Sequence, residues 1–149
     1  MQSKWIYILN HKLTEVESSN ILSDLREVFE NWQAHKIPVS SKIEILESQI
    51  ILLEALSDAS GCSIDWMNKS VSDTLLKYNV STLDPLHILI KQQENTIYQL
   101  NDLISKIEND EISIDTLFYD TTVVHGNTFE NLLKPFSKSW IKSKIKEKA

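Results

Sequence analysis

Glycine and cysteine are scarce in this chain, whose 149 residues include two glycines, Gly61 and Gly126, and one cysteine, Cys62. A phosphate-binding P-loop needs two glycines at a fixed short spacing followed by lysine and a hydroxyl residue, and a dinucleotide fingerprint needs a Gly-x-Gly-x-x-Gly run. Neither motif can be built from these glycines. A single cysteine excludes an internal disulfide and a two-cysteine redox motif.

Arginine and clustered histidine are also lacking. Arg26 is the only arginine and the net charge is −6, which argues against a protein that binds nucleic acid by neutralising phosphates. Zinc sites need cysteine and histidine at short spacings. The four histidines are scattered along the chain: His11, His35, His87 and His125. We therefore expect no metal and no cofactor.

No apolar run approaches the roughly 20 residues that span a bilayer, so we expect no insertion into a membrane. The first residues lack a small-residue cleavage site, and residues 4–9 are rich in β-branched and aromatic side chains. They predict a first strand instead of a signal peptide. Together with the single cysteine, these features favour the cytoplasm.

Apolar periodicity predicts the first helix and several later elements. Thr14 and Glu17 have the spacing of a capping box, and the apolar stripe behind them predicts a helix over residues 14–33. Further along we expect helices over residues 63–78 and 100–107 and strands near 86–91, 96–98 and 112–120. A turn at 125–127, a helical turn at 128–133 and a last short helix from residue 137 complete the prediction.

Residues 42–56 fit two patterns. Ile43 and Ile45 alternate with charged residues, as in a half-buried strand, and the denser apolar run after them suits a buried strand paired with the first. Leu46, Ile50 and Leu53 also fit one face of a helix. We favour the hairpin because the segment is rich in β-branched residues. The chain as a whole is then predicted to be one α+β domain over residues 1–149, with a mostly antiparallel sheet and two to three main helices.

The stretch SDASGCSIDW, residues 57–66, carries the candidate chemistry. It is predicted to link a buried strand to a helix N-terminus, where free amide N–H groups stabilise an anion such as a thiolate. Ser63 or Asp65 could cap that helix, and His35 or His125 could act as the base for Cys62. The alternative, which we favour, is that Cys62 is a small buried hydrophobic residue beside a glycine turn.

The chain resembles a family of small bacterial proteins of similar length. The matching residues are Trp5-x-Tyr7, Trp32-x-x-His35, the Gly-Cys-Ser-Ile-Asp run at 61–65, and Ser139–Trp140. Members often have a glycine after the histidine, where this chain has Lys36. They are often labelled as ABC transporter ATPases, a label that has no basis here because there is no P-loop. The resemblance implies no established activity.

These observations favour a non-catalytic module that binds a protein or peptide, since no catalytic constellation is complete. The alternative is a small thiol-dependent enzyme or redox sensor with Cys62 as nucleophile and Ser63 as an anion stabiliser. Oligomeric state and ligand identity are not fixed by the sequence.

Overall fold

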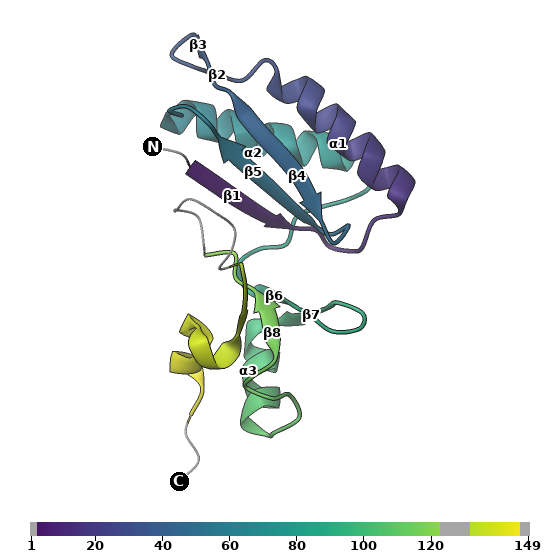
Figure 1. Ribbon diagram of the computed structural model, residues 1–149, viewed down its shortest axis with the longest axis vertical. Coiled ribbons are helices and arrows are strands. Elements are labelled where there is room, and N and C mark those ends of the chain that lie inside the picture. The colour runs from purple at the N-terminus through teal and green to yellow at the C-terminus, as the bar shows by residue number, and fades with distance from the viewer. Residues whose placement is uncertain (1–2, 123–131, 147–149) are drawn as a thin grey trace. The chain divides into compact units, whose positions relative to one another are not determined.

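The computed structural model of the chain describes residues 3–122 and 132–146 (Figure 1). Helices and antiparallel strands are mixed, so the fold class is α+β, as predicted. Contacts between residues divide the chain into two compact units. One comprises the described residues up to Leu83, and the other comprises those from Asp84 onward. Each unit has its own hydrophobic cluster. That the whole chain folds as one domain stays a prediction.

The first unit contains two long helices and five strands. In chain order they are β1 (Ser3–Ile8), α1 (Glu15–Phe29), β2 (Gln33–Ala34), β3 (Ile37–Pro38), β4 (Ser41–Leu46), β5 (Ile50–Ala55) and α2 (Gly61–Leu76). Strands β1, β5 and β4 form one antiparallel sheet in that order, and β2 and β3 form a separate short hairpin.

Both helices pack on one face of the three-stranded sheet. The register sets Trp5 of β1 and Ile43 of β4 on either side of Leu53 in the central strand β5. Side chains at alternate strand positions point to the same face, so this row and its neighbours face the helices. They share one cluster with the buried stripes of α1 and α2, including Ile21, Leu25, Met67 and Val71. This cluster is the core of the unit.

Two tyrosines link α2 and the residues that follow it to neighbouring elements. The Tyr78 hydroxyl donates a hydrogen bond to the Asp24 carboxylate of α1, which raises the pKa of Tyr78. The Tyr7 hydroxyl of β1 donates to Oδ1 of Asn68 at 2.5 Å, and burial raises the pKa of Tyr7 to about 12. Both phenols are therefore neutral donors at ordinary pH.

The hairpin predicted for residues 42–56 is confirmed, and β5 also pairs with β1 as expected. The predicted capping box of Thr14 and Glu17 is present at the start of α1. The predicted end of that helix at residue 33 is wrong, because α1 ends at Phe29 and the chain turns into the β2–β3 hairpin. Its turn residues His35 and Lys36 have φ of 52° and 66°, a conformation that the sequence, without glycine there, did not suggest.

The second unit is built on a four-stranded antiparallel sheet. It comprises β6 (His87–Ile90), β7 (Thr96–Gln99), α3 (Leu100–Glu108), β8 (Leu117–Tyr119), β9 (Leu133–Pro135) and two short 3-10 helices, η1 (Phe136–Lys138) and η2 (Trp140–Lys144). The strand order is β7-β6-β8-β9. Its core includes Ile90, Leu103 and a stacked pair, Phe118 and Phe136, whose ring centroids are 4.8 Å apart.

Strands and helices predicted in this unit are present: β6 and β8 are shorter than predicted, while β7 and α3 each extend one residue further. The strand predicted over 112–120 is reduced to β8, because a turn with a hydrogen bond from Thr116 N–H to Ser113 O precedes it. The last helix is two 3-10 segments, and Leu133 begins β9 instead of ending a helical turn. The predicted turn at 125–127 and the rest of the helical turn lie outside the described residues.

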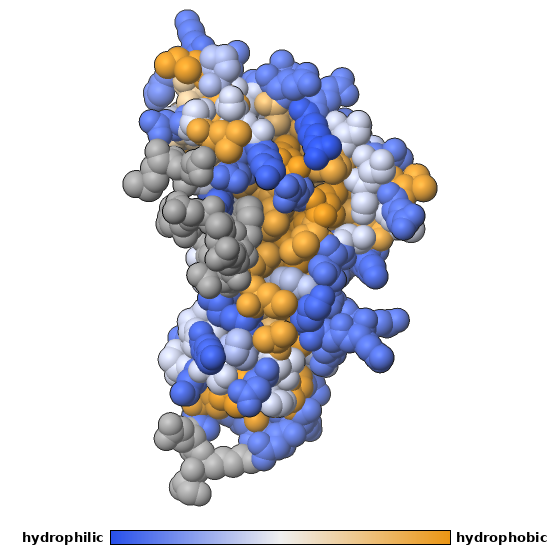
Figure 2. Space-filling view, in the orientation of Figure 1, coloured by the Kyte–Doolittle hydropathy of each residue, from blue (hydrophilic) through white to orange (hydrophobic). Residues whose placement is uncertain are grey.

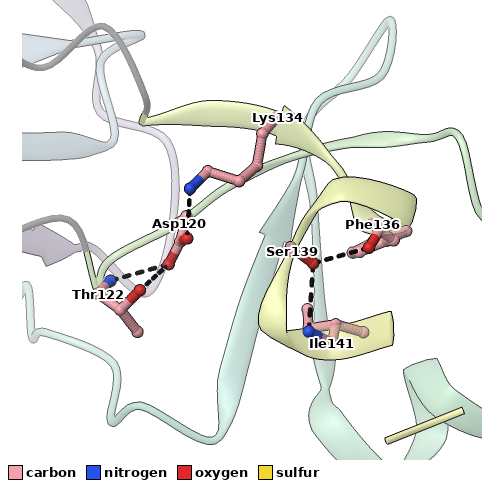
Figure 3. Close-up of polar contacts among 6 residues, drawn as sticks. All are labelled: Asp120, Thr122, Lys134, Phe136, Ser139 and Ile141. Carbon is pink, nitrogen blue, oxygen red and sulfur yellow. Dashed lines mark hydrogen bonds and ion pairs between the residues drawn. The ribbon is translucent and has the colours of Figure 1, made fainter. Parts of the chain in front are cut away.

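A buried carboxylate links β8 to β9. Asp120 is 3% exposed and accepts hydrogen bonds from the backbone N–H and the hydroxyl of Thr122, while Lys134 Nζ lies 2.9 Å away (Figure 3). Burial alone would raise the pKa of Asp120, but the hydrogen bonds from Thr122 and Lys134 outweigh it and hold that pKa below its ordinary value. Figure 3 also shows Ser139, whose hydroxyl accepts the N–H of Ile141 and donates to Phe136 O.

Candidate functional site

The stretch singled out in the sequence forms the start of α2. Ser60 is the N-cap, and its hydroxyl accepts the N–H of Ser63 at 3.4 Å. In return, the Ser63 hydroxyl accepts the N–H of Ser60 and donates to its carbonyl, both at 2.8 Å. Ser63 therefore completes a capping box around Ser60. Asp65 takes no part in the cap: it is exposed and lies beyond the first turn.

Cys62 is the second residue of α2 and is exposed, so the favoured interpretation of a small buried residue is wrong. The prediction failed because the helix begins at Gly61, two residues earlier than predicted. In this position Ser63, and not Cys62, points inward. Cys62 lines a depression of about 330 Å³, whose other walls are Asn31, Gln33, His35, Ser60, Ser63 and Trp66. Three predicted residues, Cys62, Ser63 and His35, thus line one depression. His125 lies outside the described residues.

A nucleophile–base pair is not assembled in this depression. In the described part of the chain, no hydrogen bond joins the Cys62 thiol to the His35 ring. The Ser63 hydroxyl is already engaged in the cap, and the carbonyl of Ser63 accepts Trp32 Nε1–H at 2.9 Å. Catalysis by a thiol needs a base within hydrogen-bond reach. The depression presents an accessible thiol without a formed catalytic pair.

Aromatic side chains pack against one another beneath the depression. Trp32 is fully buried, and its ring meets Phe29 edge-on at 5.4 Å between centroids. Phe29 also meets Trp66 edge-on at 5.5 Å. Trp32 packs in the core of the unit, while Trp5 is half-buried beside it. Trp66 both packs against Phe29 and lines the depression.

A second candidate site, which the sequence did not reveal, lies along the outer edge of β4. Within residues 3–122 and 132–146, β4 pairs only with β5 and so forms one edge of its sheet. Leu56 N–H donates to Ser40 O at 2.7 Å, which places the even-numbered residues of β4 on the side bonded to β5. Since backbone groups alternate along an antiparallel strand, those of Ser41, Ile43 and Ile45 point away from the sheet.

The carbonyl of Ile43 supports this assignment, since Arg26 Nη2 donates to it at 3.3 Å from α1. Between β4 and the C-terminal part of α1 lies a groove of about 510 Å³, lined by Arg26, Phe29, Glu30 and residues 38–44. The edge of β4 and a helix thus flank one hollow. An extended peptide can occupy this kind of site by adding a strand to the sheet.

On the face of β4 that points away from the helices, the side chains alternate in charge. Lys42 and Glu44 are exposed and form an ion pair of 3.3 Å, and Leu46 beyond them is 38% exposed. Figure 2 shows apolar surface bordered by hydrophilic residues over the part of the first unit where Figure 1 draws β4 and β5. The edge therefore combines open backbone groups with a simple charge pattern.

No group of three or more histidine, cysteine, aspartate or glutamate side chains within the described ranges could hold a metal ion. No helix in the same ranges is long and apolar enough to cross a bilayer. Comparison of the chain with protein-family models, with curated proteins and with solved structures finds no match.

Proposed function

We propose that this chain is a non-catalytic cytoplasmic module that binds an extended segment of a protein or peptide along the outer edge of β4. The observation that carries the proposal is the edge itself: a six-residue strand with one side free of strand partners in the described chain, beside a groove of about 510 Å³. In strand addition, main-chain hydrogen bonds supply affinity and flanking side chains supply selectivity.

The groove has walls of mixed character that suit such a ligand. Phe29 and Val39 offer apolar contact, while Arg26 and Glu30 on α1 offer charges of both signs. Arg26 already donates a hydrogen bond to the Ile43 carbonyl. Because a carbonyl oxygen can accept two hydrogen bonds, a peptide could bond to the same carbonyl without displacing Arg26. The ligand would gain pairing with Ser41, Ile43 and Ile45.

The test selects binders from a displayed library of random twelve-residue peptides on the immobilised full chain. We expect selected peptides to shift the backbone amide signals of Ser41, Ile43 and Ile45 in NMR spectra. Peptides that shift only signals around Cys62, or a selection that returns no binder, would overturn the proposal.

A matched pair of variants separates backbone pairing from side-chain contact. Ser41→Pro removes an outward N–H at a position where an edge strand tolerates proline, and Ser41→Ala keeps it. Loss of one hydrogen bond should weaken peptide binding by about tenfold in the proline variant and by less than about threefold in the alanine variant. Equal affinities of the two variants would contradict strand addition.

Thiol chemistry at Cys62 is a second candidate function, favoured by the exposure of Cys62 at the start of α2 in a depression shared with His35. Its test is the rate of alkylation by iodoacetamide against pH in the folded chain, compared for the wild type and His35→Gln. A base role for His35 requires the pH profile to change in the variant. Identical profiles would end the enzyme interpretation.

A further inference from the structure

We infer that the outer edge of β4 pairs with β4 of a second copy of this chain, antiparallel and centred on Ile43. This inference rests on the proposed function, because it names the extended segment that the edge binds. The carrying observation is that the sequence of β4, Ser-Lys-Ile-Glu-Ile-Leu, is complementary to itself in this one register.

Backbone geometry first limits the registers. Two edges can bond only where outward-facing residues lie opposite outward-facing residues. On β4 these are Ser41, Ile43 and Ile45, as the Ser40 and Ile43 carbonyls show. A two-fold pairing therefore places Ile43 opposite the partner's Ile43, or is shifted from that register by an even number of residues.

Charge then selects among the allowed registers. With the two Ile43 residues opposite, Lys42 faces the partner's Glu44 and Glu44 faces the partner's Lys42, which gives two cross-strand ion pairs on one face. A shift by two residues in one direction sets Lys42 against Lys42, and in the other direction Glu44 against Glu44. Opposite charges across a strand pair stabilise it and like charges destabilise it. Of the allowed registers, the centred one is the register that sets Lys42 and Glu44 of β4 opposite each other.

Side-chain exposure agrees with this arrangement. Lys42 and Glu44 have 63% and 52% of their side-chain surface exposed, so both can reach across to a partner strand. On the opposite face, Ile43 and Ile45 already contribute to the core of the unit. Pairing would extend the three-stranded sheet into a continuous sheet of six strands. It would also cover the edge of β4, because an exposed strand edge is prone to nonspecific pairing with other chains.

The experiment measures self-association of the full chain by sedimentation velocity from micromolar to millimolar concentration. Four proteins are compared: the wild type, Lys42→Glu, Glu44→Lys and the double swap. We expect the wild type to form a reversible dimer and each single reversal to weaken it by about tenfold, since both cross-strand pairs become repulsive. The double swap restores opposite charges and should return to within about threefold of the wild type.

Two results would overturn the inference: a wild type that stays monomeric at millimolar concentration, or dimerisation that single reversals leave unchanged. Circular dichroism of each variant checks that the fold is intact. The outcomes also separate the two proposals. If the chain is monomeric yet selected peptides shift the amide signals of β4, self-pairing fails while strand addition stands. If neither self-association nor peptide binding involves β4, both fail.

Discussion

The Asp120 carboxylate and the outer edge of β4 are both polar, but their hydrogen-bond partners come from different places. Asp120 is buried, and Thr122 and Lys134 of the same unit satisfy it. The outward backbone groups of β4 face a groove, and one of them is met by Arg26. A polar group satisfied within the chain stabilises the fold, whereas an open strand edge is available to a partner.

The start of α2 belongs with Asp120 in this comparison. Its capping box and the hydrogen bond from Trp32 to Ser63 O are all internal. The thiol of Cys62, by contrast, is exposed. The difference teaches that chemically attractive side chains can serve the fold, while a plain edge strand can leave backbone groups open.

The largest effect should come from breaking the internal support of α2. Trp32→Ala removes a fully buried ring and the donor to Ser63 O, and should lower the free energy of unfolding by about 3–5 kcal/mol. Trp32→Phe keeps most of the volume and should cost less. Urea denaturation followed by circular dichroism measures both. A loss under about 1 kcal/mol in the alanine variant would show that the start of α2 is not held from within.

Asp120→Asn removes the internally paired charge of the second unit. It should lower the free energy of unfolding by about 1–3 kcal/mol near neutral pH, measured by native-state hydrogen exchange at the amides of β6. Because the pKa of folded Asp120 is below its ordinary value, its contribution is complete above about pH 4 and is lost as the pH falls through the folded pKa. The difference between wild type and variant should therefore shrink in acid. A difference that grows in acid would contradict this account of Asp120.

Ser60→Ala removes the N-cap beside Cys62. It should lower the free energy of unfolding by about 1 kcal/mol. Thr14→Ala, at the matching capping box of α1, is the control and should cost a similar amount. Thermal unfolding measures both. If only Ser60→Ala were neutral, the start of α2 would not depend on its cap, and the comparison with Asp120 would fail there.

The smallest effect is expected in the β2–β3 hairpin, which lies between the two candidate sites. Lys36 has a φ of 66°, a left-handed conformation that glycine adopts without steric strain. Lys36→Gly should therefore raise the free energy of unfolding by about 0.5–1 kcal/mol. Lys36 lines neither the depression nor the groove, so peptide binding should not change. A destabilised variant in thermal unfolding would show that this turn gains more from the lysine than it loses in strain.

The sequence predicted most elements because their apolar periods were strong. The alternation around Ile43 and the dense run of β5 identified the hairpin, and Thr14 with Glu17 located the start of α1. The β2–β3 hairpin was missed because its positive φ angles fall on His35 and Lys36 instead of glycine. The strand over 112–116 was predicted wrongly, since alternating isoleucines there belong to a turn whose side chains pack beside the core.

The candidate site was predicted in part. Composition pointed to Cys62, Ser63 and His35, and these residues do line one depression. Burial of Cys62 was predicted wrongly because the cap lies at Ser60, whereas only Ser63 and Asp65 had been considered as caps. The edge at β4 could not be predicted from its own residues. Which strand is outermost depends on pairing, and the nearest signal was the continuous apolar run of β5, typical of a central strand.

Amide hydrogen exchange along β4, resolved by residue in NMR, tests the central claim most directly. In dilute protein, the outward amides of Ser41, Ile43 and Ile45 should exchange at least about tenfold faster than those of their inward neighbours Lys42, Glu44 and Leu46. A selected peptide, or a concentration at which the chain self-associates, should slow the outward three and leave the inward three unchanged. Outward amides as protected as the inward ones in dilute, unliganded protein would mean that the edge is already covered, and would contradict the account.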